Sequence, residues 1–199
     1  SEPGKIYIKD KYLFVNEVNK GIHVFDNTNP ASPSNVAFIN IPGNVDMAIR
    51  GNLLYVDSYI DLVVIDISDI QNPHEVDRYS NAFPNIFPEY DYQYPIAEID
   101  ASKGIVVDWK VEEITMKEGE EPKYYWGGVM EFDMAANSGG QRNSVGIAGS
   151  MARFAIKSET LYAINNNFEL KIFDISSDKV SKTDSIQTLW GIETFIYLR

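Results

Sequence analysis

The sequence predicts an all-β protein assembled from repeated units of four short strands, and three observations lead to this prediction. Two similar stretches, residues 51–69 ("GNLLYVDSYIDLVVIDISD") and 159–178 ("ETLYAINNNFELKIFDISSD"), each place two strand-like runs around a polar break. Aromatic residues make up 13% of the 199-residue chain, a content that suits pleated sheet surfaces. Long stretches with helical periodicity are absent, whereas turn residues recur at short intervals.

The repeat has a period near 40 residues. The third strand of each unit ends in an apolar–Asp step, in "HVFDN", "VVIDI", "MEFDM" and "KIFDI", and two of the three spacings between these aspartates are 40 and 41 residues. The third spacing is 67 residues, so this stretch carries insertions. Four strands per unit of about 40 residues is the arrangement of a β-propeller blade. A β-sandwich also has regular strands, but it has no reason to repeat its sequence.

We therefore expect four complete blades, at residues 4–45, 46–96, 97–152 and 153–192, and the start of a fifth at 193–199. Two insertions interrupt the pattern, at residues 81–95 and 109–126. Propellers close with about four to eight blades. We expect this chain to be a fragment of a larger propeller of roughly seven blades.

The repeat also has a recognisable sequence. "DLVVIDISDIQNP" resembles the LVIVD repeat, a bacterial and archaeal propeller-type motif, and "GIHVFDNTNPASP" and "ELKIFDISSDK" are similar to it. "GVMEFDMAANS" is a weaker match. The resemblance implies a propeller-type fold and an extracytoplasmic protein, secreted or on the surface of a bacterium, whose signal or anchor is not in this chain. It implies almost nothing about chemistry.

Composition excludes several classes of function. The net charge is −12, so we expect no binding to nucleic acid or to an anionic membrane. The acidic excess favours solubility, with an acidic face for cations or a basic partner as the alternative. The chain has no cysteine, which excludes disulfides, iron–sulfur clusters and cysteine–zinc sites. No run approaches the roughly 18 apolar residues of a membrane span.

The two insertions form the first candidate binding surface. In a blade whose strands run up and down, the turn between strands 2 and 3 and the link to the next blade emerge on the same face, so both insertions are expected side by side. Loops on a rigid scaffold often carry function, and exposed aromatic side chains are common anchors of binding patches. The alternative is that these aromatics pack on one another and hold the loops in place. The candidates are Tyr90, Tyr92, Tyr94, Tyr124 and Trp126.

A charged residue precedes the inner strand of each unit and forms the second candidate site. Inner strands surround the central channel of a propeller, so these residues are expected to form a charged ring at its mouth. In the alternative interpretation, the charges pair with neighbours or cap turns. The matched positions are Lys5, Asp46, Glu98, Arg153 and Glu193.

Catalytic and cofactor motifs were not found. The two histidines, His23 and His74, occupy non-equivalent strand and turn positions, which argues against a two-histidine metal site. Neither a nucleophile elbow nor a phosphate-binding loop is present. We expect no cofactor, although the carboxylates of "FPEYDYQ" and "KEGEEP" are compatible with a weak calcium site.

The sequence therefore predicts a binding or interaction module for a protein or glycan ligand, presented by aromatic and acidic loops on one propeller face. The rest of the same chain or a second copy of it is expected to be a further partner. The alternative function is a carbohydrate-active hydrolase or lyase at the channel mouth, an idea that rests on analogy between folds. That site would use Asp46, Glu98, Asp100 and Arg153.

Overall fold

The computed structural model describes residues 3–84, 88, 91, 93–115, 124–125, 152–166, 168–192 and 194. The chain divides into two compact units. The first unit comprises residues 1–86 and 147–199, and the second comprises residues 87–146.

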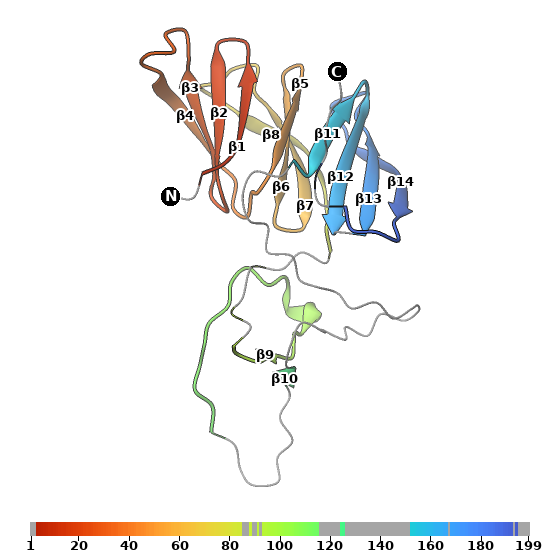
Figure 1. Ribbon diagram of the computed structural model, residues 1–199. Helices are drawn as coiled ribbons and strands as arrows, with labels where there is room; N and C mark the ends of the chain where they lie inside the picture. Colours follow the sequence, from red (N-terminus) through yellow and green to blue (C-terminus); the bar gives the residue numbers. More distant parts are fainter. Residues whose placement is uncertain are drawn as a thin grey trace. The chain divides into compact units, whose positions relative to one another are not determined.

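Three four-stranded antiparallel sheets, which we call blades, make up the described part of the first unit (Figure 1). In each blade the strands are neighbours in chain order. The first blade contains β1 (Pro3–Lys9), β2 (Tyr12–Glu17), β3 (Gly21–Asp26) and β4 (Ser34–Asn40). The second blade contains β5 (Met47–Arg50), β6 (Leu53–Ser58), β7 (Asp61–Asp66) and β8 (His74–Tyr79). The C-terminal blade contains β11 (Phe154–Lys157), β12 (Thr160–Asn166), β13 (Glu169–Asp174) and β14 (Ser181–Gln187).

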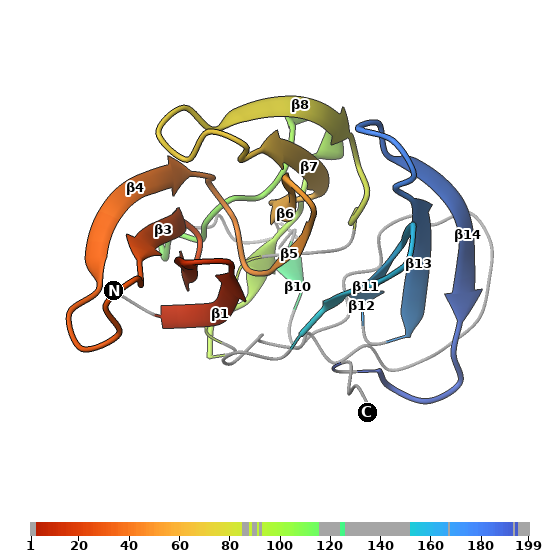
Figure 2. The same ribbon diagram turned by 90° about the horizontal axis from the view of Figure 1, so that it is seen from above.

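The three blades fan out around a common centre. Figure 2 shows the first strands β1, β5 and β11 toward the middle and the fourth strands β4, β8 and β14 at the outside. The inner strand β5 lies next to both β1 and β11. Four strands per unit, arranged from the centre outward, confirm the predicted all-β fold with propeller-type blades.

The same local devices recur in each blade. The turn between its first two strands starts with a residue of positive φ, which two-residue hairpins of this kind require. These residues are Asp10 (φ 52°), Gly51 (φ 57°) and Ser158 (φ 55°). A register shift between the third and fourth strands falls at equivalent positions, after Val24, Val64 and Ile172. Such bulges increase the local twist of the outer strand.

The structure explains the repeated aspartate of the apolar–Asp step. In the first blade, Asp26 Oδ1 accepts the backbone N–H of Thr28 at 2.8 Å. Asp66 and Asp174 accept the N–H groups of Ser68 and Ser176 at 2.7 and 2.8 Å. The aspartate thus holds the turn that follows the third strand, a role for which its short side chain is well suited.

Neighbouring blades pack through apolar sheet faces. Phe14, Val24, Met47 and Leu54 belong to the cluster between the first and second blades. A second cluster joins the second and C-terminal blades. In it, the Phe83 ring lies 5.7 Å from that of Phe154. The second blade is therefore covered on both faces, because in a repeat protein each internal unit packs against the unit on either side of it.

Part of the predicted insertion 81–95 belongs to this core. Ala82 and Phe83 are 1% and 0% exposed, and the Phe83 N–H donates to the carbonyl of Ile60 at 2.7 Å. Lys171 of β13 donates to the carbonyl of Ala82 at 2.6 Å. The first residues of the insertion thus close the joint between two blades, because an aromatic ring fills the space that their sheet faces leave.

The described part of residues 87–146 contains a short antiparallel pair and one turn of 3₁₀-helix. β9 (Ile96–Ala97) pairs with β10 (Tyr124–Tyr125), and η1 spans Ala101–Lys103. The repeat pattern predicts strand-like segments at "IDA" (99–101) and "GIVVDW" (104–109), but the structure has no strand between residues 98 and 115. The C-terminal blade packs directly on the second blade. Whether residues 97–152 form a blade stays a prediction, because most of them lie outside the described residues.

The described residues contain no helix with the length and hydrophobicity of a membrane span.

Candidate functional site

Three of the five predicted ring residues come together at the centre of the blades. Lys5 Nζ lies 2.9 Å from Asp46 Oδ1. Asp46 Oδ2 accepts the backbone N–H groups of Arg153 at 2.6 Å and Phe154 at 2.8 Å. Lys5 belongs to the first blade, Asp46 immediately precedes β5, and Arg153 immediately precedes β11. The Asp46 carboxylate therefore connects all three blades.

Asp57 extends this network and pairs with the Arg153 side chain. Arg153 Nη1 lies 2.9 Å from Asp57 Oδ2, and both side chains are at most 4% exposed. Asp57 Oδ1 accepts the N–H groups of Val45 and Asp46 at 2.8 and 3.0 Å and the Asn44 Nδ2 donor at 2.9 Å. Burial raises the pKa of Asp57, although Arg153 and the N–H groups of Asp46 and Val45 act in the opposite direction.

Two asparagines complete the network. Asn44 Nδ2 donates to the carbonyl of Asp46 at 2.9 Å, and Asn16 Nδ2 donates to Asn44 Oδ1. Sequence reasoning missed Asn16, Asn44 and Asp57. A usable signal was the polar residue that ends the apolar run of the second strand, in "YLFVNE" and "LLYVDS". A buried polar side chain at that position needs a hydrogen-bonding partner from a neighbouring element.

The network is arranged as a joint between blades rather than as an open site. Asp46 is 1% exposed, and its two oxygens accept from Lys5 and from backbone N–H groups. This geometry corresponds to the alternative in which the charges pair with neighbours. In the described part of the chain, no group of three or more His, Asp or Glu side chains is placed to hold a metal ion.

The other predicted site residues divide into two groups. Glu98 and Tyr94 lie in residues 87–146, and both are exposed. The two-residue spacing of Glu98 and Asp100 predicts that both lie in one strand and point the same way. Neither is in a strand: Asp100 accepts the Ser102 N–H at 3.0 Å and caps η1. Tyr124 is placed in β10, and nothing is described of its side chain. The other predicted residues lie outside the described part of the chain, namely Tyr90, Tyr92, Trp126 and Glu193.

Two contacts join the predicted insertions 81–95 and 109–126. The indole N–H of Trp109 donates to the carbonyl of Pro88 at 2.9 Å. β9, directly after the first insertion, pairs with β10 inside the second. Apolar side chains near these contacts are exposed, with exposed fractions of 47% for Tyr94, 52% for Val107 and 62% for Val111. The described part of this unit thus exposes several apolar side chains.

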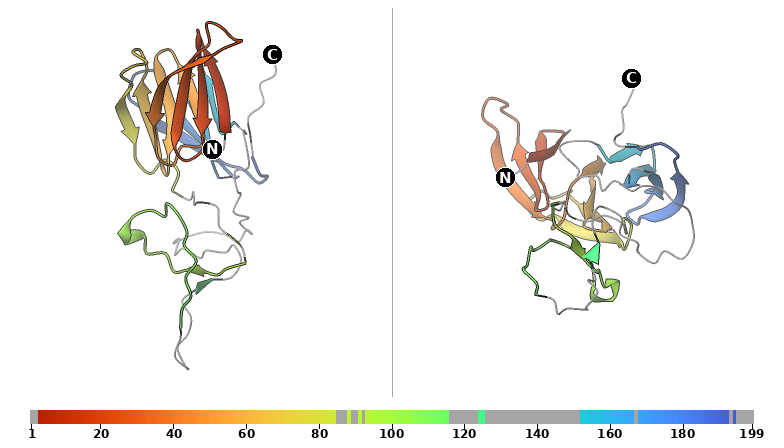
Figure 3. Two further views of the ribbon diagram at one scale, coloured as in Figure 1. Left: turned by 90° about the vertical axis from the view of Figure 1, so that its left-hand side faces the viewer. Right: turned by 60° about the horizontal axis from the view of Figure 1, so that its bottom comes forward.

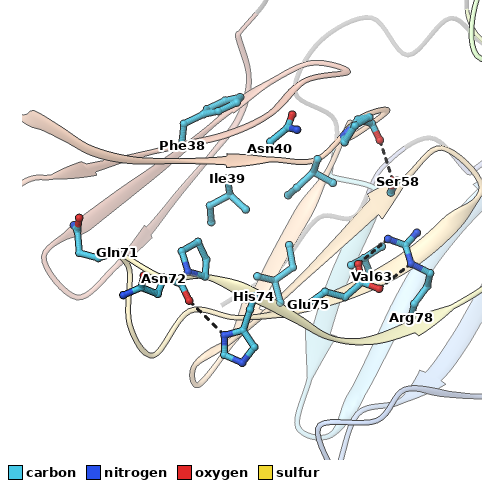
Figure 4. A pocket seen from close by; sticks show the side chains of 14 residues that line it. Phe38, Ile39, Asn40, Ser58, Val63, Gln71, Asn72, His74, Glu75 and Arg78 are labelled. Atoms are coloured by element: carbon cyan, nitrogen blue, oxygen red, sulfur yellow. Dashed lines mark hydrogen bonds and ion pairs between the residues drawn. The ribbon is translucent and has the colours of Figure 1, made fainter.

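A groove of about 500 Å³ runs between the outer strands of the first and second blades (Figure 4). Its wall includes Ile39 of β4, Val63 and Ile65 of β7, and Arg78 of β8. Arg78 forms ion pairs with Glu75 at 2.7 Å and Asp61 at 2.8 Å. His74 contacts the Asn72 carbonyl at 3.3 Å. Glu75 is the single carboxylate among the described residues that line the groove, so its wall offers no pair of carboxylates for acid–base catalysis.

Repeated four-stranded blades define a propeller-type repeat protein, a class suited to protein interaction in general. Residues 4–40 and 43–81 match the LVIVD repeat, so the first two blades each carry one copy of it. This match confirms the resemblance found in the sequence. A search of curated proteins finds no match.

Two solved structures show distant similarity in fold. One is the N-terminal domain of Nup159, with 8% identity and a TM-score of 0.41, and it aligns with 94% of this chain and 31% of its own. The other is from a complex described as S. cerevisiae Dbp5, a variant, bound to Nup159, a Gle1 variant, IP6 and ADP. Its identity is 8%, its TM-score is 0.40, and the coverage is 94% of this chain and 30% of that one. The chain thus spans less than one third of the length of these two structures.

Proposed function

We propose that this chain is a protein-binding module and that the described part of residues 87–146 contributes its binding surface. One observation carries the proposal: four aliphatic side chains within ten residues are exposed, namely Ile105 (45%), Val107 (52%), Val111 (62%) and Ile114 (60%). Single exposed apolar residues are ordinary on protein surfaces, whereas such a concentration is typical of interaction sites. Tyr94 adds an aromatic side chain to the same unit.

Charge narrows the class of partner. Three exposed carboxylates, Asp108, Glu112 and Glu113, are interspersed among the aliphatic side chains, and Lys110 is paired with Glu112 at 2.7 Å. A partner with an apolar pocket and a basic rim would complement this stretch, because opposite charges at a rim steer association. The predicted aromatic residues of the two insertions belong to the same proposed surface: Tyr90, Tyr92, Tyr94, Tyr124 and Trp126.

The resemblance to the LVIVD repeat supports placing this module outside the cytoplasm, on the cell surface or secreted. Fractionation of the source cells with an antibody to the chain tests this placement. Recovery in the cytoplasmic fraction alone would rule it out. For the hydrolase or lyase alternative, we find no supporting observation among the described residues.

The binding proposal is tested by comparing variants of the intact chain. Purified protein is cross-linked in an extract of the source organism, and the captured proteins are identified by mass spectrometry. Their affinity is then measured by calorimetry with the purified partner. The variant Val107→Ser/Val111→Ser/Ile114→Ser removes apolar surface without changing the charge. We expect it to lower affinity at least tenfold, a change of about 1.4 kcal/mol.

The control variant Leu189→Ser removes an apolar side chain that is 93% exposed in the other unit, and it should bind like the wild type. A second variant, Asp108→Asn/Glu112→Gln/Glu113→Gln, removes three carboxylates and tests whether the partner has a basic rim. It should weaken association with the partner mainly at low salt. Equal affinity of the wild type and the triple serine variant would refute the proposed surface.

A further inference from the structure

Among the described residues, no other blade covers one of the two sheet faces of the first blade. Ile6, Val15, His23 and Phe38 lie opposite one another across its four strands and form one row of this face. Ile8, Leu13 and Phe25, with Asn35, form the next row. Ile6 is 59% exposed and Ile8 is 66% exposed. In Figure 3, the left view shows the molecule from this side, with the strands of the first blade in front. We call this surface the open face of the first blade.

The equivalent positions of the other two blades are covered. Ile6 corresponds by register to Met47 and Phe154, which are 0% and 2% exposed. Ile8 corresponds to Ile49, which is 8% exposed. In those blades, the side chains are buried by the face of the preceding blade. The open face is therefore one half of the joint that this chain already forms twice.

The C-terminal blade presents the other half of the same joint. Tyr162 and Ile172 lie opposite each other on its remaining face, and both are partly exposed. Their equivalents in the first blade, Phe14 and Val24, are 1% and 0% exposed because the second blade covers them. On the same face, Leu170 lies opposite Ile186, which is 46% exposed.

We propose that the open face of the first blade binds the remaining face of the C-terminal blade of a second copy of this chain. The contact would continue the two joints inside the chain, with aromatic and aliphatic side chains on both faces. It is a head-to-tail contact, and two such contacts close a ring of two copies. Two copies of the three observed blades provide six blades, within the range of about four to eight that closed propellers use. This inference does not rest on the proposed function of residues 87–146.

Several polar groups of the joint are already paired within one copy, whereas the Asp184 carboxylate lies opposite Ile172 on the C-terminal face and has to stay at the solvated edge of the contact. The two ring nitrogens of His23 contact Glu17 Oε2 at 2.9 Å and Asn35 Nδ2 at 3.2 Å. Lys5 is paired with Asp46, and Arg153 is paired with Asp57. Burial of the open face therefore leaves no charge or ring nitrogen of these residues without a partner, which lowers the cost of covering polar groups on the first blade.

Net charge determines how salt affects this contact. Each copy carries a net charge of −12, so two copies repel each other at long range. The proposed contact is apolar, and added salt screens the repulsion without breaking an ion pair of the joint. We therefore expect association to strengthen as the salt concentration rises, which is the opposite of a contact held by salt bridges.

The test is sedimentation velocity of the intact chain over a range of concentrations and salt. We expect a species of twice the 22.5 kDa chain mass, and its fraction should increase with protein concentration and with salt concentration. Ile6→Asp/Ile8→Asp changes the open face of the first blade, and Leu170→Asp/Ile172→Asp changes the opposite face. Each variant alone should associate at least tenfold more weakly than the wild type. A mixture of the two should recover association through the one joint that remains intact.

Two controls keep the result interpretable. Circular dichroism and thermal unfolding establish whether each variant folds. If Leu170→Asp/Ile172→Asp does not fold, Ile6→Asp/Ile8→Asp alone is sufficient to test the proposal. Lys103→Glu lies in the other unit, at a side chain that is 82% exposed, and changes the net charge by the same two units as Ile6→Asp/Ile8→Asp, so it should leave association unchanged. A wild-type chain that stays monomeric at its highest soluble concentration overturns the proposal. So does a dimer that Ile6→Asp/Ile8→Asp does not weaken.

Discussion

Arg153 and Asp57 form a buried ion pair between two blades: Arg153 Nη1 lies 2.9 Å from Asp57 Oδ2, and 96 residues of sequence separate them. Arg153 also donates twice to the Ile164 carbonyl, from Nε and Nη2 at 3.2 Å each. Asp57 accepts three further hydrogen bonds from residues 44–46. Because nearly every polar atom of the pair has a partner, the interaction can hold the second and C-terminal blades in one orientation.

Breaking this pair should destabilise the protein strongly. Arg153→Met leaves the Asp57 carboxylate buried without its counter-charge, and such a loss costs about 3–5 kcal/mol. The double variant Arg153→Met/Asp57→Asn leaves no unpaired charge and should recover part of that loss. Urea unfolding of the wild type, both single variants and the double variant measures the coupling energy. Additive effects of the two substitutions would contradict a direct interaction.

Phe83 should be a major contributor to the joint between the second and C-terminal blades. Its ring is 0% exposed, and it lies 5.7 Å from the Phe154 ring and 5.4 Å from Arg153 Cζ. Phe83→Ala should lower the free energy of unfolding by about 3–5 kcal/mol because it leaves a cavity between two sheets. Leu189→Ala is the control, since a surface substitution changes stability by only about 0.5 kcal/mol. Urea unfolding distinguishes the two, and equal midpoints would show that Phe83 does not close the joint.

The turn aspartates should make stability depend on pH in the acid range. Hydrogen bonds from Thr28, with the nearby Lys11 ammonium, lower the pKa of Asp26 from 3.8 to about 2. A carboxyl with a lowered folded-state pKa contributes stability above its ordinary pKa and loses it as the pH falls through the folded value. The Asp26 contribution should therefore disappear between about pH 4 and pH 2.

Asp26→Asn isolates this effect, because the amide oxygen can still accept from Thr28 but does not titrate. Thermal unfolding midpoints measured from pH 5 to pH 2 should fall less steeply for Asp26→Asn than for the wild type. Asp26→Ala removes the acceptor as well and should be less stable than Asp26→Asn at pH 5. Parallel pH curves for the wild type and Asp26→Asn would contradict the assigned role.

Much of the fold could be predicted because its determinants are local. The apolar–Asp step, the turns and the 40-residue spacing are short-range patterns, and they predicted the four-stranded blades of the first unit. The candidate site was harder. Lys5, Asp46 and Arg153 were identified as a matched set from their spacing, but their burial depends on which blades meet. Asp57 and Asn44 were missed, because a lone polar residue in a strand acquires its partner from elsewhere in the chain.

By itself, the sequence determined the strand pattern, the repeat and the absence of disulfide chemistry, since each depends on residue type and near neighbours. Tertiary structure decided that Phe83 fills a joint, that the central charges are buried in pairs, and that β11–β14 packs against β5–β8. It also decided which apolar faces are covered: Leu54 is fully buried, whereas Ile6 and Ile8 are exposed. The physical reason is that burial and pairing are properties of contacts between distant segments, and a repeated sequence presents the same face in every blade whether or not a neighbour covers it.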